Sequence, residues 1–168
     1  MAREIVLWPH KVLTTATQPV TDFGPALEQL LSEMLVAVQE AKGIGIAANQ
    51  LGEPLRMALV GREDGTFFEI INPQILERSG QIILEEGCLS VPDEWEKAPR
   101  YKKVKVRYQD KAQQWHEEEA EGRLAHVFQH EIDHLDGHVF VELLSGLKRS
   151  LIQERMKKYQ KFLKRKKD

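Results

Sequence analysis

The feature that most constrains the fold is a change of hydrophobic periodicity, which occurs twice along the chain. Apolar residues recur at three- and four-residue spacing after Gly24-Pro25, which predicts an amphipathic helix that ends near Gly43. Helical spacing returns over residues 123–137 and again over roughly 145–165. Short runs of strand-like composition lie between the first two helices. These runs are RMALVG, FFEIINP, QIILEE, KVKVRYQD and QQWHEEE.

This order of elements predicts an α+β fold, in which short antiparallel strands pack around the helix at 123–137 and a further helix follows at the C-terminus. A short strand is also expected in the segment IVLW near the N-terminus. Because the 168 residues contain no long linker, we expect a single catalytic domain over 1–168, with 147–168 as a basic C-terminal helix or tail. The residues expected on the apolar side of that helix are Leu147, Leu151, Ile152, Met156, Tyr159 and Leu163.

The cysteine content and the length of the apolar runs indicate the cellular compartment of the protein. Cys88 is the one cysteine of the chain, so an internal disulfide is excluded and a reducing compartment is expected. No apolar run reaches the length that spans a bilayer, and the N-terminal segment lacks the long apolar core of a signal peptide. We therefore expect a cytoplasmic protein without a membrane partner.

Charge is distributed unevenly along the chain. Residues 148–168 carry ten Lys/Arg and two Asp/Glu, a net charge of +8, whereas the remaining residues carry 14 basic and 24 acidic side chains, a net charge of −10. The sum agrees with the formal net charge of −2. Such asymmetry predicts that the C-terminal helix either contacts an anionic partner or presents a solvated face.

The helix expected at 123–137 contains QHEIDHLDG, in which two histidines are four residues apart. On a helix, His130 and His134 therefore project from one face and can hold one metal ion. Glu131 lies beside them, where its carboxylate can accept a proton from a water held by the metal. The alternative interpretation is a helix end with two surface histidines.

A third ligand would complete this metal site. The metzincin pattern fails because Phe140 occupies the position of its third histidine. A thermolysin-like site would take a glutamate from the next helix, where Glu154 is an alternative within a strongly basic segment. Cys88, in EEGCLS, is either a small buried apolar residue or a thiolate ligand for Zn²⁺ or Fe²⁺ that leaves a fourth position open. In the second case the backbone amide of Leu89 would lie near the metal, where it could stabilise a developing oxyanion.

The segment GIGIAANQ, residues 43–50, imitates a dinucleotide-binding loop. That fingerprint requires a strand before it and a helix after it, whereas here a helix precedes and a strand-like run follows, so a dinucleotide-binding loop is excluded. We interpret the small residues as a wall where the backbone approaches a ligand and where the Gln50 carboxamide points inward. The alternative is a tight connection between a helix and a strand.

Taken together, GIGIAANQ, EGCLS and QHEIDHLDG occur in order along the chain. This set resembles the motifs of the peptide deformylases, which are metal hydrolases that remove the formyl group from the N-terminal methionine of new proteins. The resemblance runs from about residue 5 to residue 145, includes EIVLWPHKVLTTATQPV and INPQI, and is nearest to the bacterial-type enzymes.

The resemblance implies one divalent metal ion with a water as its fourth ligand. Fe²⁺ is the ion expected in the cell, and Zn²⁺, Ni²⁺ or Co²⁺ suit the same ligands. By resemblance, Glu131 activates the water and then passes a proton to the departing amine, while the Gln50 side chain and the Leu89 backbone N–H hold the oxyanion. The residues implied as metal ligands are Cys88, His130 and His134.

The resemblance also implies contacts to formyl-methionyl nascent peptides. The backbone of the substrate would bind in strand fashion, the methionine side chain would enter an apolar pocket, and one carboxylate would orient ligands or substrate. The residues given these roles are Gly45, Ile44, Glu86 and Val127. Phe128 is a further pocket candidate. Trp95 departs from the Arg or Tyr that family members often carry at the pocket rim, which leaves the preference for residues after methionine open.

The basic C-terminal helix gains a role from the same resemblance. Bacterial family members contact the ribosome through a C-terminal helix, so we expect residues 147–168 to meet RNA phosphate or an acidic ribosomal protein. Binding to a specific DNA is not expected.

Overall fold

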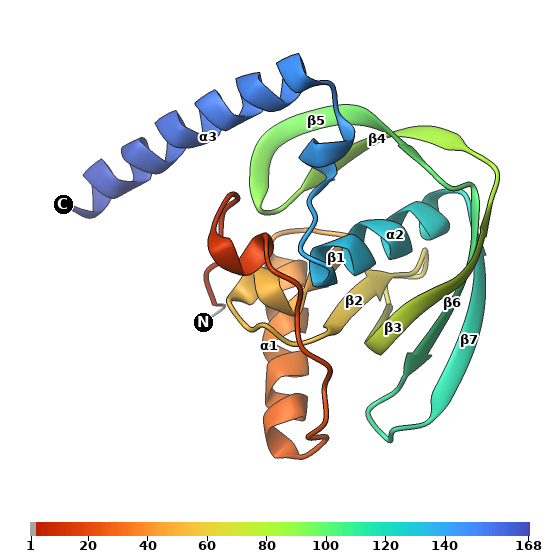
Figure 1. Cartoon of the computed structure of the whole chain (residues 1–168). Helices are drawn as coiled ribbons and strands as arrows, with labels where there is room; N and C mark the ends of the chain where they lie inside the picture. The colour runs from red at the N-terminus through yellow and green to blue at the C-terminus, as the bar shows by residue number, and fades with distance from the viewer. Residues whose placement is uncertain (1–2) are drawn as a thin grey trace.

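The computed structural model describes residues 3–168 and has the expected α+β architecture (Figure 1). The helices in this range are α1 (Pro25–Glu40), α2 (Arg123–Leu135) and α3 (Gly146–Lys167). The short 3₁₀ helices are η1 (Lys11–Leu13), η2 (Ala48–Leu51) and η3 (Phe140–Leu143). The strands are β1 (Gly45–Ala47), β2 (Met57–Gly61), β3 (Phe67–Ser79), β4 (Ile82–Cys88), β5 (Val91–Arg100), β6 (Lys103–Gln109) and β7 (Trp115–Glu121).

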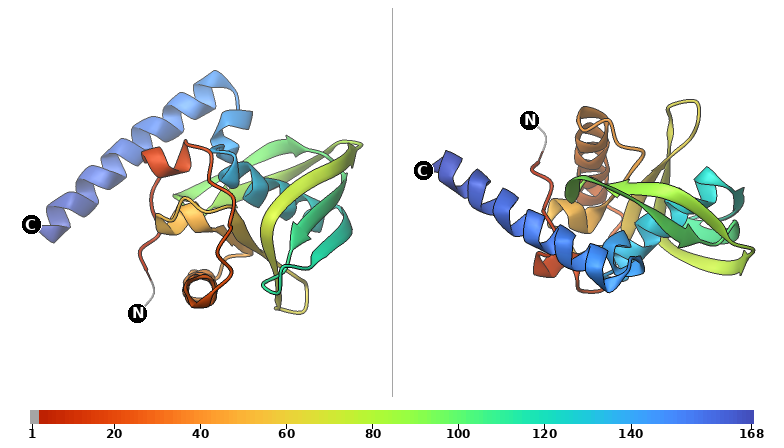
Figure 2. Two further views of the ribbon diagram at one scale, coloured as in Figure 1. Left: turned by 60° about the horizontal axis from the view of Figure 1, so that its bottom comes forward. Right: turned by 90° about the horizontal axis from the view of Figure 1, so that it is seen from above.

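The strands form two antiparallel sheets. Five of them follow the order β1-β2-β3-β6-β7, and β4 pairs with β5 as a separate two-stranded sheet. The long strand β3 pairs with β2 through its first half and with β6 through its second half, which lets it curve around the helix within (Figures 1 and 2). Register shifts in the β3–β6 ladder accommodate this curvature.

Helix α2 lies between the two sheets and forms the centre of the molecule (Figure 1). It packs against β1, β2 and β7 of the five-stranded sheet. Its apolar side joins the sheet residues in one buried cluster, which includes Ala58, Val60, Ile70, Val106, Val127, Phe128 and Leu135. The helix that carries the two histidines is therefore held against the five-stranded sheet by its apolar face.

Most of the elements predicted from periodicity are confirmed. The helices at 25–40, 123–135 and 146–167 agree with the predicted ranges to within a few residues, and each of the five strand-like runs lies in a strand. The strand expected in IVLW is wrong, because this segment is fixed by separate hydrogen bonds from Val6 N to Gln50 O and from Trp8 N to Ser90 O. Strands β1 and β5 were not predicted.

The expected apolar side of α3 is buried only in part. Ile152 and Met156 pack into a cluster with Trp8 and Phe140, but Leu147, Leu151 and Tyr159 are exposed. The helix contacts the body as far as Gln160, whose Nε2 donates to Trp8 O at 3.0 Å, and its C-terminal end extends away from the two sheets (Figures 1 and 2). Among the described residues, no helix combines the length and the apolar character needed to cross a bilayer.

The end of α2 is fixed by the N-terminal segment that crosses it. Gly137 has φ +84°, and its N–H donates to His134 O at 3.0 Å. A Cβ built on Gly137 would lie 2.9–3.1 Å from backbone atoms of residues 14–16. Thr17 also donates to Leu135 O through both its N–H and its hydroxyl. A side chain at position 137 would therefore force apart two segments that hold the histidine helix in place.

We expect Gly137→Ala to destabilise the protein much more than Gly65→Ala. Both glycines have positive φ, so both substitutions cost about 1–2 kcal/mol of backbone strain. Gly65 has open space around it, whereas Gly137 meets backbone, which adds about 1–3 kcal/mol. Urea unfolding of both variants measures the difference. Equal losses for the two variants would show that the close approach at Gly137 contributes nothing.

Candidate metal centre

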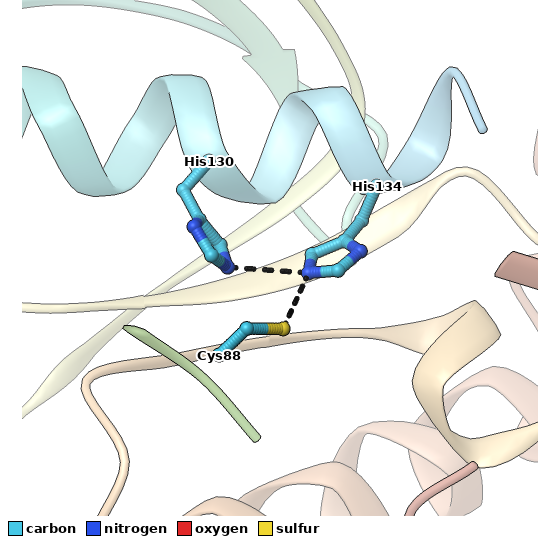
Figure 3. A group of neighbouring side chains, drawn as sticks. All are labelled: Cys88, His130 and His134. Atoms are coloured by element: carbon cyan, nitrogen blue, oxygen red, sulfur yellow. Dashed lines mark hydrogen bonds between the residues drawn. The ribbon is translucent and has the colours of Figure 1, made fainter. Parts of the chain in front are cut away.

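Three potential metal ligands converge at the middle of the molecule. His130 and His134 project from the same side of α2 toward Cys88 at the end of β4 (Figure 3). His134 Nε2 lies 3.2 Å from His130 Nε2 and 3.3 Å from Cys88 Sγ, and one ligand atom from each residue lies within 4.8 Å of the other two. Both histidines are buried. The helix alone brings the two imidazoles together, and the β4–β5 sheet adds the thiol.

The spacing of these atoms suits a tetrahedral metal ion. Two nitrogen ligands at their normal distance from one tetrahedral Zn²⁺ lie about 3.3 Å apart, and a nitrogen and a sulfur ligand lie about 3.6 Å apart. The separations of 3.2 Å and 3.3 Å around His134 Nε2 are close to these values. Two imidazoles and a thiol are also the donor set that borderline divalent ions favour. The residues therefore fit a bound divalent ion.

A buried carboxylate organises the groups around the centre. Glu86 on β4 accepts hydrogen bonds from Arg100 Nε at 3.2 Å and Arg100 Nη2 at 2.6 Å, and it pairs with His130 Nδ1. His126 Nε2 lies 2.9 Å from the other side of the same carboxylate. Arg100 on β5 in turn pairs with Asp133 on α2. This network fixes the ring of His130 with Nδ1 toward Glu86 and Nε2 toward Cys88 and His134.

The network sets the charges of the buried groups. Burial alone would raise the pKa of Glu86, but its close contacts with His126, His130 and the Arg100 guanidinium hold that pKa well below its usual range. Burial would lower the pKa of His130, but its contacts with Cys88 and Glu86 raise it well above the ordinary value. Burial and the nearby charge of His130 lower the pKa of His134 well below the ordinary value. Glu86 therefore favours positive charge on His130, whereas burial and His130 disfavour it on His134.

Glu131 stands beside the ligands with a free carboxylate oxygen. Its Oε1 lies 3.8 Å from His130 Nε2, and its buried Oε2 has no hydrogen-bond partner among the described residues. Burial raises the pKa of Glu131 to about 7. A Cβ on Gly45 would lie only 2.8 Å from Glu131 Oε1, so the glycine leaves room for this carboxylate. A carboxylate with a pKa near neutrality can both accept and release a proton at pH 7.

Gln50 is held in one orientation next to the thiol. Its Oε1 accepts from Ala47 N at 2.9 Å, and its Nε2 donates to Ser90 Oγ at 3.1 Å and to Cys88 Sγ at 3.6 Å. The side chain is buried in η2, which directly follows β1. The segment GIGIAANQ thus combines a strand and a 3₁₀ turn that direct one carboxamide toward the candidate ligands.

Most of the predicted site residues line one pocket of about 370 Å³, and His134 is not among its lining residues. The predicted site residues that line it are Ile44, Gly45, Gln50, Glu86, Cys88, Leu89, Val127, His130 and Glu131. Trp95 lines it as well. Phe128 does not, because it points into the apolar core between α2 and the sheet. Glu154 is exposed on α3 and is not part of the ligand cluster. The structure therefore does not support a thermolysin-like site in which Glu154 is the third ligand.

Sequence reasoning missed the residues that support the site. His126 precedes His130 by one helical turn and Asp133 follows it by three residues, so helical spacing could have indicated both. Ser90 closes the motif EEGCLS, but nothing local shows that it accepts from Gln50. Arg100 had no local signal, because its partners are 14 and 33 residues away.

The fold and this site define the chain as an α+β protein built around a buried Cys-His-His cluster that can hold a divalent metal ion. The sequence matches the family model described as polypeptide deformylase over residues 2–150. It is 42% identical over 164 residues to a peptide deformylase of Wolinella succinogenes, covering 94% of this chain and 96% of the relative. It is 44% identical over 168 residues to a peptide deformylase of Acidobacterium capsulatum, covering 96% and 97%.

Solved structures agree with the sequence comparison. The crystal structure of a peptide deformylase from Legionella pneumophila superposes with a TM-score of 0.92 at 35% identity, covering 98% of this chain and 99% of that one. The chain belongs to the polypeptide deformylase family and is a hydrolase.

Replacing Glu86 by Gln should weaken both metal binding and the fold. The neutral amide cannot balance Arg100 or orient His130 as the carboxylate does, so we expect metal affinity to fall about 10- to 100-fold. Loss of one partner of the buried pair should lower the free energy of unfolding by about 3 kcal/mol. Competition with a chelator and urea unfolding measure the two effects. Glu85→Gln, at an exposed neighbouring position, is the control that should change neither.

Proposed function

We propose that this chain is a metal-dependent peptide deformylase that hydrolyses the formamide bond of formyl-methionyl nascent peptides and releases formate. The observation that carries the proposal is the convergence of Cys88, His130 and His134 beside a pocket that Cys88, His130 and Glu131 line, and Glu131 has a carboxylate oxygen without a hydrogen-bond partner among the described residues. The family membership supports the reaction class. The residues proposed here to hold one divalent ion are Cys88, His130 and His134, with Fe²⁺ as the ion in the cell and Zn²⁺, Ni²⁺ or Co²⁺ as replacements.

The ion supplies Lewis-acid chemistry when bound: it polarises the formyl carbonyl and lowers the pKa of water, which provides a nucleophile at neutral pH. Glu131 accepts the proton that this nucleophile releases and later donates it to the amine that departs. Its raised pKa, about 7, suits both transfers. The buried environment around Glu131 keeps bulk water away from the proton while it is held there.

The oxyanion that develops on the former formyl oxygen needs nearby donors. In the proposal, Gln50 Nε2 and the backbone N–H of Leu89 supply them. The contacts of Gln50 with Ala47 and Ser90 fix its carboxamide before the substrate arrives, so that little reorganisation is needed in the transition state. Gly45 on the outer strand β1 offers backbone groups to the peptide in strand fashion.

The methionine side chain requires an apolar part of the same pocket. Val127 is buried on α2 and lines the pocket, and Ile44 lies at its mouth. Glu86 remains a proposed binding residue, and its hydrogen bonds with Arg100 and His130 and its close contact with His126 favour an indirect role through the metal ligand over direct contact with the peptide.

The reaction is tested by incubating the purified protein with formyl-Met-Ala-Ser and measuring formate and free amine, with metal content determined in parallel. Glu131→Gln should retain its metal and fold but lose activity by about 100-fold or more, because the amide cannot accept the proton. Cys88→Ser should instead lose most of its metal, since a neutral hydroxyl is a much weaker ligand than a thiolate. A fully metal-loaded Glu131→Gln protein with near-normal turnover would contradict the role of Glu131.

We also propose that α3 contacts the ribosome through its basic end. Lys164, Arg165, Lys166 and Lys167 occupy the last turn, away from the residues of α3 that are buried against the body. Their reversal to Glu should weaken ribosome binding and should leave turnover of a short formyl peptide almost unchanged.

Wild-type ribosome binding should fall steeply with salt if phosphate contacts dominate. A matched variant with Gln at these four positions halves the charge change and should bind with intermediate strength. Equal affinity of all three proteins at low and moderate salt would refute the docking role.

A further inference from the structure

Asn49 is a buried polar residue that the proposed mechanism does not use. It stands directly before Gln50 in the 3₁₀ helix η2, near the end of the segment GIGIAANQ, and its exposed fraction is 0%. Burial of a carboxamide costs free energy unless hydrogen bonds replace those that it makes with water. The groups that Asn49 contacts therefore indicate why the chain places a polar side chain at this position.

The amide nitrogen of Asn49 holds the end of the histidine helix. Asn49 Nδ2 donates to His134 O at 2.6 Å and to Val12 O at 3.4 Å. The carbonyl groups in the last turn of a helix have no partner within the helix, so His134 O needs partners from outside it. It receives two, from Asn49 and from the N–H of Gly137 at 3.0 Å. Asn49 thus fixes the turn of α2 that carries a candidate metal ligand.

Each of these two side chains also has a buried polar atom without a partner. Neither Asn49 Oδ1 nor His134 Nδ1 has a hydrogen-bond partner among the residues that the structure describes, and both side chains are fully buried. The Asn49 amide nitrogen must face the two carbonyls that it contacts, so Oδ1 remains as an acceptor. His134 Nε2 faces Cys88 and His130, and Figure 3 shows Nδ1 on the side of the ring that points away from them. When Nε2 binds a metal ion, Nδ1 carries the ring hydrogen and is a donor.

The other histidine ligand differs, because it already has its outer partner. Glu86 pairs with His130 Nδ1 and keeps Nε2 directed at the centre. Histidines that bind metals almost always donate their second ring N–H to a carboxylate, a carbonyl oxygen or a water. Within residues 3–168, nothing fills this role for His134. A buried donor and a buried acceptor, on residues that a hydrogen bond already joins, are the polar surroundings that one internal water requires.

We propose that Asn49 is a positioning residue for the metal ligand His134, which it holds through the backbone carbonyl and through one buried water that joins Asn49 Oδ1 to His134 Nδ1. The inference rests on the proposed function. Asn49 then does for His134 what Glu86 does for His130, but with a neutral acceptor. Because η2 also carries Gln50, one short turn of chain aligns both the proposed oxyanion donor and a metal ligand.

The first test measures Zn²⁺ affinity of the full chain by competition with a chelator. Asn49→Leu keeps the size of the side chain but removes its donor and its acceptor, so the affinity should fall about tenfold or more, the loss typical for an outer partner of a ligand. Asn49→Thr should recover part of the affinity, because a hydroxyl can both donate and accept.

Asn72→Ala is the matched control for this test. Asn72 Nδ2 likewise joins two segments, by donating to Val20 O at 3.0 Å and to Gln109 Oε1 at 2.8 Å, and neither partner belongs to the candidate metal centre. The substitution should lower the free energy of unfolding without changing the affinity for Zn²⁺. Urea unfolding of each variant shows how much stability is lost.

The second test observes the ring hydrogen by NMR of the Zn²⁺-loaded protein. The hydrogen on His134 Nδ1 should exchange slowly with solvent and should show a nuclear Overhauser effect to a long-lived water. Asn49→Leu should remove this contact and shift the signal, whereas the Nδ1 signal of His130, which Glu86 holds, should stay in place. A general loss of stability would not move the signal of His134 alone.

The outcomes separate the inference from the function on which it rests. If the wild type binds no divalent ion or leaves formyl-Met-Ala-Ser intact, the proposed function fails and the inference falls with it. If the wild type is active but Asn49→Leu binds Zn²⁺ as tightly, or the His134 signal is the same in both proteins, Asn49 does not position His134. If Asn49→Leu does not fold, the wild-type spectrum decides: a water contact at His134 Nδ1 supports the inference, and its absence overturns it.

Discussion

The buried carboxylate of Glu86 is the interaction on which the site depends most. It joins Arg100 on β5 to His126 and His130 on α2, and Arg100 returns to α2 through Asp133. An unpaired carboxylate at this depth would be strongly unfavourable, so its partners must be in place when the β4–β5 sheet closes over the helix. The same closure delivers Cys88 to the two histidines. The contacts that hold the small sheet against α2 are therefore the same ones that place Cys88 beside the two histidines.

Much of this arrangement could be predicted from the sequence because it depends on local spacing. A four-residue interval on a helix places His130 and His134 together whatever the rest of the chain does. The apolar periodicity of α1 and α2 likewise fixed their ranges, and the glycine after α2 marked its end. The combination of three motifs indicated the family, which the comparisons with known proteins confirm. The roles of the individual residues remain predictions.

The remainder could not be predicted because its signals are tertiary. Strand β5 has the sequence VPDEWEKAPR, whose two prolines and five charged residues are untypical of a strand. They are compatible with β5 because it is an edge strand of a two-stranded sheet. Strand β1 has only three residues and depends on pairing with β2. The pairing of Arg100 with Glu86 and Asp133 joins positions without a common motif. The apolar residues of α3 followed the helical period, but periodicity does not state how far a helix stays in contact with the body.

The projection of α3 makes it a spacer as well as a surface. Its 22 residues correspond to a rod of about 33 Å, and roughly 18 Å of it extends past Arg155, the residue that ties the helix to Glu94 at the pocket rim. Whatever binds the last turn is thereby kept at a fixed distance from the pocket mouth. If the proposed ribosome contact forms there, an emerging peptide would have a set length of chain to cross, and the number of helical turns beyond Arg155 would determine how early it could reach the pocket.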